Sequence, residues 1–219
     1  LSNANYHLAI SIMSDSDLKQ LNFPQTISDS SIKGIILVEI CDKVVCDALS
    51  QFNLPIVSVD MPNVPFEELN GIDVVTMESK KNLKKIINQL IEKGAESFGF
   101  VGGLYSPNVS RGFQERYNAL SECLAEHQLP LNQKNCLLHQ TPEDFRNFQT
   151  TVNNLQAMIS LPDVFICGND WTAIQLIYAL QFLGFQIPKD ICVVGFDNIP
   201  AASRISPSLT TISTPQKYL

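Results

Sequence analysis

Basic residues are scarce in this sequence. The chain of 219 residues has 15 lysines and arginines against 22 aspartates and glutamates, which gives a net charge of −7 at pH 7 and an isoelectric point near 4.9. A surface this acidic is poorly suited to gripping the phosphate backbone of a nucleic acid. If the whole protein binds DNA, another segment must make that contact.

Histidines and closely paired cysteines are also lacking. The chain has three histidines and six cysteines, and no two cysteines have the Cys-x-x-Cys spacing that is typical of zinc sites. We therefore predict no metal site. We expect reduced thiols, with Cys167 and Cys192 serving as small apolar residues inside buried strands.

Motifs of catalysis and phosphate binding are missing too. There is no Gly-x-Ser-x-Gly motif, no metal-ligand cluster and no glycine-rich dinucleotide loop. Gly102-Gly103 follows an apolar strand but fits neither the dinucleotide nor the Walker pattern, so we interpret it as a tight turn or a crossing between subdomains. We predict no catalytic residue and no cofactor, and hence a protein that is not an enzyme.

Long apolar runs do not occur. None approaches the roughly 20 residues that a membrane helix needs. The segment from Leu1 to Ile10 has no basic region and is too polar for the apolar core of a signal peptide. We therefore expect a cytoplasmic protein with no membrane partner. Apolar residues still make up 45% of the chain, which is enough for a sizeable core.

The most informative stretch of the sequence runs from Val164 to Thr214. An apolar run ends in Gly168-Asn-Asp170, a helical repeat of apolar residues ends at Gly184, and a second apolar run leads into Gly195-Phe-Asp197. This order predicts a strand, a helix and a parallel strand. Ligands bind at the carboxyl ends of such strands, so Asn169 and Asp170 stand where a small-molecule site is expected.

Strands and helices alternate along the rest of the chain. We predict strands at 6–12, 32–38, 55–60, 72–76, 97–101, 136–140, 164–167, 191–195 and 208–213. We predict helices at 42–52, 79–93, 112–127, 141–160 and 171–183, and a short helical piece at 201–205. The pattern occurs once on each side of Gly102-Gly103, which indicates an α/β fold of two Rossmann-like parallel-sheet lobes with a ligand cleft between them. We assign 1–103 and 198–214 to the N-terminal lobe, and 104–197 and 215–219 to the C-terminal lobe.

Eight segments of the chain match a known family when they are taken together. They are Ile32-Lys-Gly-Ile-Ile-Leu, Leu54-Pro-Ile-Val-Ser-Val-Asp, Gln89-Leu-Ile-Glu-Lys-Gly-Ala, Phe98-Gly-Phe-Val-Gly-Gly, Arg116-Tyr-Asn-Ala-Leu, Gly168-Asn-Asp, Ile187-Pro-Lys-Asp-Ile-Cys-Val-Val-Gly-Phe-Asp and Pro207-Ser-Leu-Thr-Thr-Ile. With these segments the chain resembles the effector-binding domain of LacI-type bacterial transcription regulators, whose fold is shared with periplasmic sugar-binding proteins (periplasmic-binding-protein-like, type I). Almost the whole chain is covered. Ala119 and Ala95 stand where the family usually has glycine and histidine.

The resemblance implies which residues bind the ligand. Asp170 is expected to accept hydrogen bonds from an effector, although it could instead cap the helix that follows. Arg116 is expected to donate its guanidinium fork, with Arg111 as the alternative if the register differs. Ser110 is a weaker candidate, and Asn169 could hold either a ligand or only its own turn.

Three other residues have two readings each. Trp171 could stack on a sugar, but packing in the lobe core is favoured. Asp197 is interpreted as a turn residue rather than as a residue that contacts the ligand. Phe145 lies near the place where the family often has an aromatic residue over the ligand.

The sequence therefore predicts the effector-sensing and dimerisation domain of a LacI-type regulator, a homodimer that binds a small molecule, a sugar or sugar-like compound, between its lobes. Operator DNA would be bound only through a helix-turn-helix domain that is absent from this chain. The alternative is an extracytoplasmic sugar-binding protein of an ABC transporter. An upstream helix-turn-helix or a signal peptide would distinguish the two.

Overall fold

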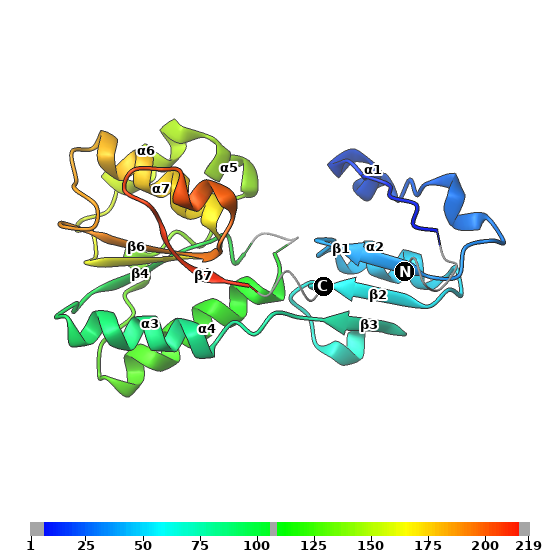
Figure 1. Ribbon diagram of the computed structural model, residues 1–219, viewed down its shortest axis with the longest axis horizontal. Helices are drawn as coiled ribbons and strands as arrows, with labels where there is room; N and C mark the ends of the chain where they lie inside the picture. The colour runs from blue at the N-terminus through cyan, green and yellow to red at the C-terminus, as the bar shows by residue number, and fades with distance from the viewer. Residues whose placement is uncertain (1–6, 106–108, 215–219) are drawn as a thin grey trace. The chain divides into compact units, whose positions relative to one another are not determined.

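Two compact units make up the chain in the computed structural model, which describes residues 7–105 and 109–214 (Figure 1). The first unit is Leu1–Val75 and the second is Thr76–Leu219. Each contains a parallel β-sheet with helices packed on it. The predicted α/β class with two parallel-sheet lobes is thereby confirmed.

The first unit is built on three parallel strands in the order β1-β2-β3, paired in the register Ile35–Ile56–Ile72. Its main helix starts at Asp42, whose carboxylate accepts hydrogen bonds from the backbone N–H groups of Val44 (2.8 Å) and Val45 (3.4 Å). The elements of this unit are α1 (Asp15–Gln20), η2 (Gln25–Ser28), β1 (Ile35–Val38), α2 (Lys43–Ser50), β2 (Ile56–Val59), η3 (Phe66–Glu68) and β3 (Ile72–Val75).

One face of this sheet is packed by α2, through Val45 and Leu49, as the apolar spacing of the helix predicts. Ile36 and Val38 of β1 are exposed, so only the other face of this strand is buried among the described residues. The predicted strand at 6–12 is wrong, because its described residues, 7–12, form neither helix nor strand. An apolar run becomes a strand only where a neighbouring strand accepts its hydrogen bonds.

The second unit is built on four parallel strands in the order β4-β5-β6-β7. The register aligns Phe98 with Val164 and Cys192, and Val194 with Thr210. The elements of this unit are α3 (Lys81–Glu92), β4 (Phe98–Val101), α4 (Arg111–Glu126), η4 (Gln133–Asn135), α5 (Pro142–Arg146), α6 (Phe148–Gln156), β5 (Val164–Cys167), α7 (Asp170–Phe182), β6 (Cys192–Asp197), η5 (Pro200–Ser203) and β7 (Thr210–Ser213).

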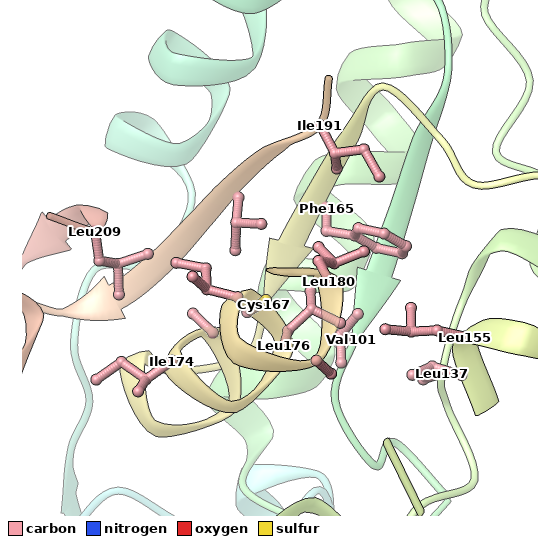
Figure 2. Packing of buried hydrophobic residues seen from close by; sticks show 14 of the residues in the cluster. Val101, Leu137, Leu155, Phe165, Cys167, Ile174, Leu176, Leu180, Ile191 and Leu209 are labelled. Atoms are coloured by element: carbon pink, nitrogen blue, oxygen red, sulfur yellow. The ribbon is translucent and has the colours of Figure 1, made fainter. Parts of the chain in front are cut away.

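Helices cover both faces of this sheet (Figure 1). Successive side chains of β5 point to opposite faces: Phe165 and Cys167 pack against α6 and α7, whereas Val164 and Ile166 pack against α3 and α4. Figure 2 shows the first of these layers, in which α7 residues such as Leu176 and Leu180 lie over the strands. A sheet buried on both faces explains why its strands are continuous apolar runs in the sequence.

The predicted helix at 141–160 is two helices, α5 and α6, which meet at Asn147. Asn147 has extended backbone angles, and its side chain caps α6 by accepting a hydrogen bond from the N–H of Thr150 (3.2 Å). The predicted strand at 136–140 is reduced to a single bridge between Leu137 and Val101.

The predicted lobe boundaries differ from the two units. The segments 76–103 and 198–214 were expected in the N-terminal lobe, but β4 pairs with β5 and β7 pairs with β6, so both segments belong to the second unit. The change of unit falls between Val75 and Thr76 and not at Gly102-Gly103. Gly102 instead begins a turn after β4, where its N–H donates to the carbonyl of Leu137 (3.0 Å).

All six cysteines are free thiols. Cys46 is buried in the first unit and Cys167 in the second, whereas Cys192, which was expected to be buried, is only partly so. Burial, followed by the nearby carboxylates of Asp47 and Asp42, raises the pKa of Cys46 to about 11. Burial, with a further contribution from Asp170, also raises the pKa of Cys167. Both thiols are therefore protonated and chemically quiet in the folded chain.

Candidate functional site

Asn169 is the N-cap of α7. Its backbone is extended, and its side-chain oxygen accepts a hydrogen bond from the N–H of Thr172 (2.9 Å). Of the two roles that the sequence allows, the structure shows the turn-holding one, while a ligand contact stays a prediction. Asn169 also takes the cap position that was the alternative role of Asp170.

Replacing Asn169 with alanine is expected to lower the free energy of unfolding by about 1 kcal/mol, because the N–H of Thr172 loses its acceptor at the helix terminus. Urea denaturation of the wild type and Asn169→Ala measures this difference. Asn169→Asp keeps the acceptor and should stay close to wild type. Equal stability of all three proteins would contradict a capping role.

Asp170 follows directly and is completely buried, with 0% of its surface exposed. Its carboxylate accepts hydrogen bonds from the Thr211 hydroxyl (2.6 Å) and the N–H of Ile199 (2.8 Å). It thereby ties the start of α7 to β7 and to the loop after β6. Burial raises the pKa of Asp170, and the Thr211 hydroxyl with backbone N–H groups of residues 196, 198 and 199 offsets part of that increase.

Gly195, on β6, leaves the space that the Asp170 carboxylate occupies. A Cβ atom at position 195 would overlap with Oδ1 of Asp170. The geometry favours a structural role for this carboxylate, since both of its oxygens are engaged within the unit. Its role as a ligand acceptor remains a prediction.

Arg116 lies on α4 and is also buried, with 6% of its surface exposed. Its Nη1 donates to the carbonyl of Gly168 (2.6 Å), and the guanidinium carbon lies 3.7 Å from the ring centroid of Phe196 and 5.5 Å from that of Phe113. A guanidinium over an aromatic face is attracted to it. The side chain is thus fixed by the end of β5, by β6 and by its own helix.

Ser110 is the N-cap of α4, and its hydroxyl accepts a hydrogen bond from the N–H of Gly112 (3.0 Å). A Cβ atom on Gly112 would lie 3.1 Å from the Ser110 hydroxyl and 3.3 Å from Nη2 of Arg116, so these two side chains flank the same small space. Arg111, the alternative to Arg116, forms an ion pair with Glu115 (3.2 Å).

The four predicted ligand residues therefore gather at one end of the sheet. Asn169 and Asp170 follow β5, Arg116 bonds to the residue between β5 and Asn169, and Ser110 begins the helix that carries Arg116. Gly168 permits this close approach, because a Cβ atom there would lie 2.6 Å from the Phe113 ring. The arrangement offers a fixed cation beside a helix N-terminus, which suits a ligand with several acceptor oxygens.

The structure places the remaining aromatic candidates elsewhere. Trp171 is 62% exposed, so the expected packing in the lobe core is wrong. Phe145 is partly buried against the core layer of α6 and α7. Asp197 and Asn198 both have positive φ angles (111° and 55°), which fits the predicted turn.

Sequence reasoning missed Thr211 and Phe196 as partners of the site. Both lie in the segments that carry the resemblance, but no local pattern shows which side chain they face. Tyr105 and His139 form a stacked pair with ring centroids 4.5 Å apart, and they were also missed.

A cavity of about 470 Å³ lies at the opposite end of the sheet, lined by segments that precede β5 and β6. None of the four predicted residues lines it. Within 7–105 and 109–214, no group of three or more metal-binding side chains comes together. No helix in this part of the chain is long and apolar enough to span a membrane.

The model of the periplasmic binding protein-like domain matches residues 87–219, and the chain belongs to this family. It is 29% identical to catabolite control protein A of Staphylococcus xylosus, over 96% of this chain and 61% of the relative. It is 26% identical to the HTH-type transcriptional repressor PurR of Photobacterium profundum, over 99% of this chain and 63% of the relative. The chain thus spans about three-fifths of the length of these relatives. They are transcription regulators and not enzymes, as predicted for this chain.

Solved structures of LacI-type regulators share the fold. A transcriptional regulator CelR–cellobiose complex superposes with a TM-score of 0.74 at 17% identity, over 94% of this chain and 60% of that one. A LacI family regulator from Lactobacillus casei with bound glucose gives 0.72 at 21% identity, over 98% of this chain and 78% of that one. The likeness to LacI-type effector domains is therefore confirmed at the level of fold.

Proposed function

We propose that this chain is the effector-sensing and dimerisation domain of a LacI-type DNA-binding regulator, and that a sugar or sugar-like compound is its effector. The observation that carries this proposal is the position of Arg116, fixed on the Gly168 carbonyl and over Phe196 beside the start of α7. A buried guanidinium that is already oriented loses little freedom when it binds hydroxyl or carboxylate oxygens. The sugar-bound structures that share this fold support the ligand class.

The proposed mechanism is a shift of populations. An effector that binds one conformation of the protein more tightly than another raises the share of that conformation, and a homodimer passes the change to its DNA-binding domains. A coupling of about 1–3 kcal/mol is usual for such systems. A net charge of −7 makes this chain itself poorly suited to binding operator DNA. The proposal therefore has a separate domain bind the operator, and such a regulator would act in the cytoplasm.

The second candidate is an extracytoplasmic sugar-binding protein of a transporter, because the fold is shared with that class. The relatives are named as a catabolite control protein and a transcriptional repressor, which favours the regulator over the transporter component. Gel-shift assays with the full-length protein and its upstream DNA separate the two. Effector-dependent retardation supports the regulator, and sugar binding without any DNA binding supports the transporter component.

The test of the site is a calorimetric screen of the chain against free sugars, sugar phosphates and nucleobases. The strongest ligand is then titrated into Arg116→Lys, which keeps a charge but loses the planar fork, and into Arg146→Lys as the control, since the Arg146 side chain is 77% exposed. We expect binding at least about tenfold weaker in Arg116→Lys and unchanged in Arg146→Lys. Equal affinity in all three proteins would remove Arg116 from the site, and a hit only among nucleobases would overturn the sugar class.

A further inference from the structure

The cavity of about 470 Å³ at the amino ends of β5 and β6 lies away from the residues of the proposed effector site. Three stretches of the chain line it: the end of α6 with the loop after it (155–163), the segment after α7 (183–185) and the residues that lead into β6 (190–191). Its volume falls within the roughly 300–1,000 Å³ that is typical of small-molecule sites in proteins. The second unit therefore offers a ligand-sized space that the proposed function does not use.

Apolar side chains make up the most buried part of this cavity. Leu155 and Ile191 are buried, and Figure 2 shows both of them in the core layer of α6 and α7. Burial of apolar surface is favourable, so these walls suit the apolar body of a ligand. Four partly buried side chains of the lining pack against the same core layer: Met158, Leu161, Leu183 and Phe185.

Two exposed carboxylates also line the cavity, those of Asp163 and Asp190. Oδ2 of Asp163 accepts hydrogen bonds from the N–H groups of Glu96 (2.9 Å) and Ser97 (2.9 Å). Oδ2 of Asp190 accepts one from the N–H of Gln186 (2.7 Å). Backbone groups thus orient both side chains, and within the described residues these hydrogen bonds use Oδ2 alone. Oδ1 of each carboxylate is therefore able to accept a further hydrogen bond.

The lining of the cavity is negatively charged. None of its described residues is basic, and neither carboxylate belongs to an ion pair within the described part of the chain. Burial acts to raise the pKa of Asp163, but the hydrogen bonds from Glu96 and Ser97 outweigh it and lower the pKa, so this carboxylate is ionised at neutral pH. A matching ligand therefore combines an apolar body with a positive charge.

We propose that this cavity binds a small organic cation with an apolar body, such as an alkylammonium compound. Its alkyl chain would lie against Leu155, Met158 and Phe185, and its ammonium group would donate hydrogen bonds to Asp163 and Asp190. Carboxylates that backbone groups already hold lose little freedom when they bind such a group. This site is separate from the effector site, so the inference goes beyond the proposed function and does not depend on it.

Three probes with the same alkyl chain test the class of ligand: n-hexylammonium, n-hexanol and n-hexanoate. Each is titrated calorimetrically into the chain at low ionic strength, where exposed charges are least screened. We expect n-hexylammonium to bind at least about tenfold more tightly than n-hexanol, and n-hexanoate to bind most weakly. Equal affinities for the ammonium and the alcohol overturn the proposal, and so does a lack of measurable ammonium binding.

The double variant Asp163→Asn, Asp190→Asn removes both charges and keeps an acceptor oxygen for the backbone N–H groups. We expect it to bind n-hexylammonium at least about tenfold more weakly and n-hexanol as the wild type does. The matched control is Glu67→Gln, Glu68→Gln, which changes the net charge equally at two exposed residues of the first unit and should leave both affinities unchanged. Urea denaturation checks that each variant is folded. Wild-type ammonium affinity in the aspartate variant overturns the proposal, as does an equal loss in the control.

The variant Ser160→Trp tests the place of binding, since Ser160 is an exposed residue in the lining of the cavity. The indole ring would occupy part of the space, so we expect both n-hexylammonium and n-hexanol to bind at least about tenfold more weakly. Saturating glucose, in contrast, should leave both affinities unchanged in the wild type. Wild-type binding by Ser160→Trp would put the cation outside the cavity, and competition by glucose would put it in the effector site. Either result overturns the proposal.

Discussion

Asp170→Ala is expected to lower the free energy of unfolding by about 3 kcal/mol at neutral pH. The substitution leaves the Thr211 hydroxyl and the N–H of Ile199 without their acceptor in a site with no exposed surface. Each buried polar group that loses its partner costs about 1–3 kcal/mol, and the cavity adds to this. Urea denaturation followed by far-ultraviolet circular dichroism measures the loss.

Asp170→Asn is the matched variant, because it keeps the shape and one acceptor oxygen. It should lose less than Asp170→Ala. Thr211→Val removes one donor and, combined with Asp170→Ala, gives a double-mutant cycle in which the two losses should not add. Additive losses, or a stability of Asp170→Ala equal to wild type, would show that this network does not hold the end of the sheet together.

The same carboxylate gives a defined pH dependence. Burial raises its pKa above the ordinary value of 3.8, so the folded state favours the protonated form. The proton-linked part of the Asp170 contribution to stability is complete below that value and is lost as the pH rises through the folded pKa, while the hydrogen bonds to the ionised carboxylate remain at neutral pH. The stability difference between wild type and Asp170→Ala should therefore grow as the pH is lowered from neutrality. A difference that shrinks toward low pH would contradict the burial argument.

This test needs the stability difference between wild type and Asp170→Ala, because other carboxylates change the stability of both proteins with pH in the opposite direction. Burial acts to raise the pKa of Asp163, but hydrogen bonds from the N–H of Glu96 and from Ser97 outweigh it, so that the pKa is lowered. Asp163 thus stabilises the fold above its ordinary pKa and stops doing so as the pH falls.

Arg116→Met is expected to abolish most effector binding, weakening it by at least about 100-fold, and to lower the free energy of unfolding by about 2 kcal/mol. Methionine keeps an apolar stem of similar length but removes the donor to the Gly168 carbonyl and the cation over Phe196. A hydrogen bond from a charged donor contributes about 1.5–3 kcal/mol, and a desolvated cation–π contact about 2 kcal/mol. The burial cost of the guanidinium is recovered in the variant, so the net loss is smaller than their sum.

Calorimetric titration and urea denaturation of the same samples separate the two effects. Arg146→Met, at an exposed position, should change stability by no more than about 0.5 kcal/mol and leave binding intact. If Arg116→Met binds the effector as wild type does while losing stability, Arg116 is a packing residue and the ligand lies elsewhere.

Local patterns in the sequence were sufficient for most elements of the fold. The apolar spacing of α2, α3, α4 and α7 and the continuous runs of β4, β5 and β6 are properties of single segments, and the structure contains all of them. The break at Asn147 was missed, since an asparagine inside an apolar helical repeat becomes a cap only when its side chain bonds to the next turn. The lobe boundary was misplaced because the sequence of a strand does not show which other strand it pairs with.

The site was found in outline but not in its contacts. The position of Asn169, Asp170 and Arg116 follows from strand order and from the resemblance. The partner of Asp170, Thr211, lies 41 residues further along the chain, on a strand whose neighbour the sequence does not reveal. Hydrogen-bond donors that lie far away in the sequence decide whether a buried carboxylate is available to a ligand or is engaged in an internal hydrogen-bond network.

The two protonated, unreactive thiols allow the opening of each unit to be timed separately. Cys46 and Cys167 sit one in each unit, and each is shielded until its own unit opens. Pulsed alkylation, read out peptide by peptide, would time the two openings in one experiment. An effector held by residues of the second unit should slow the labelling of Cys167, and any delay at Cys46 would measure how far that protection spreads through the molecule.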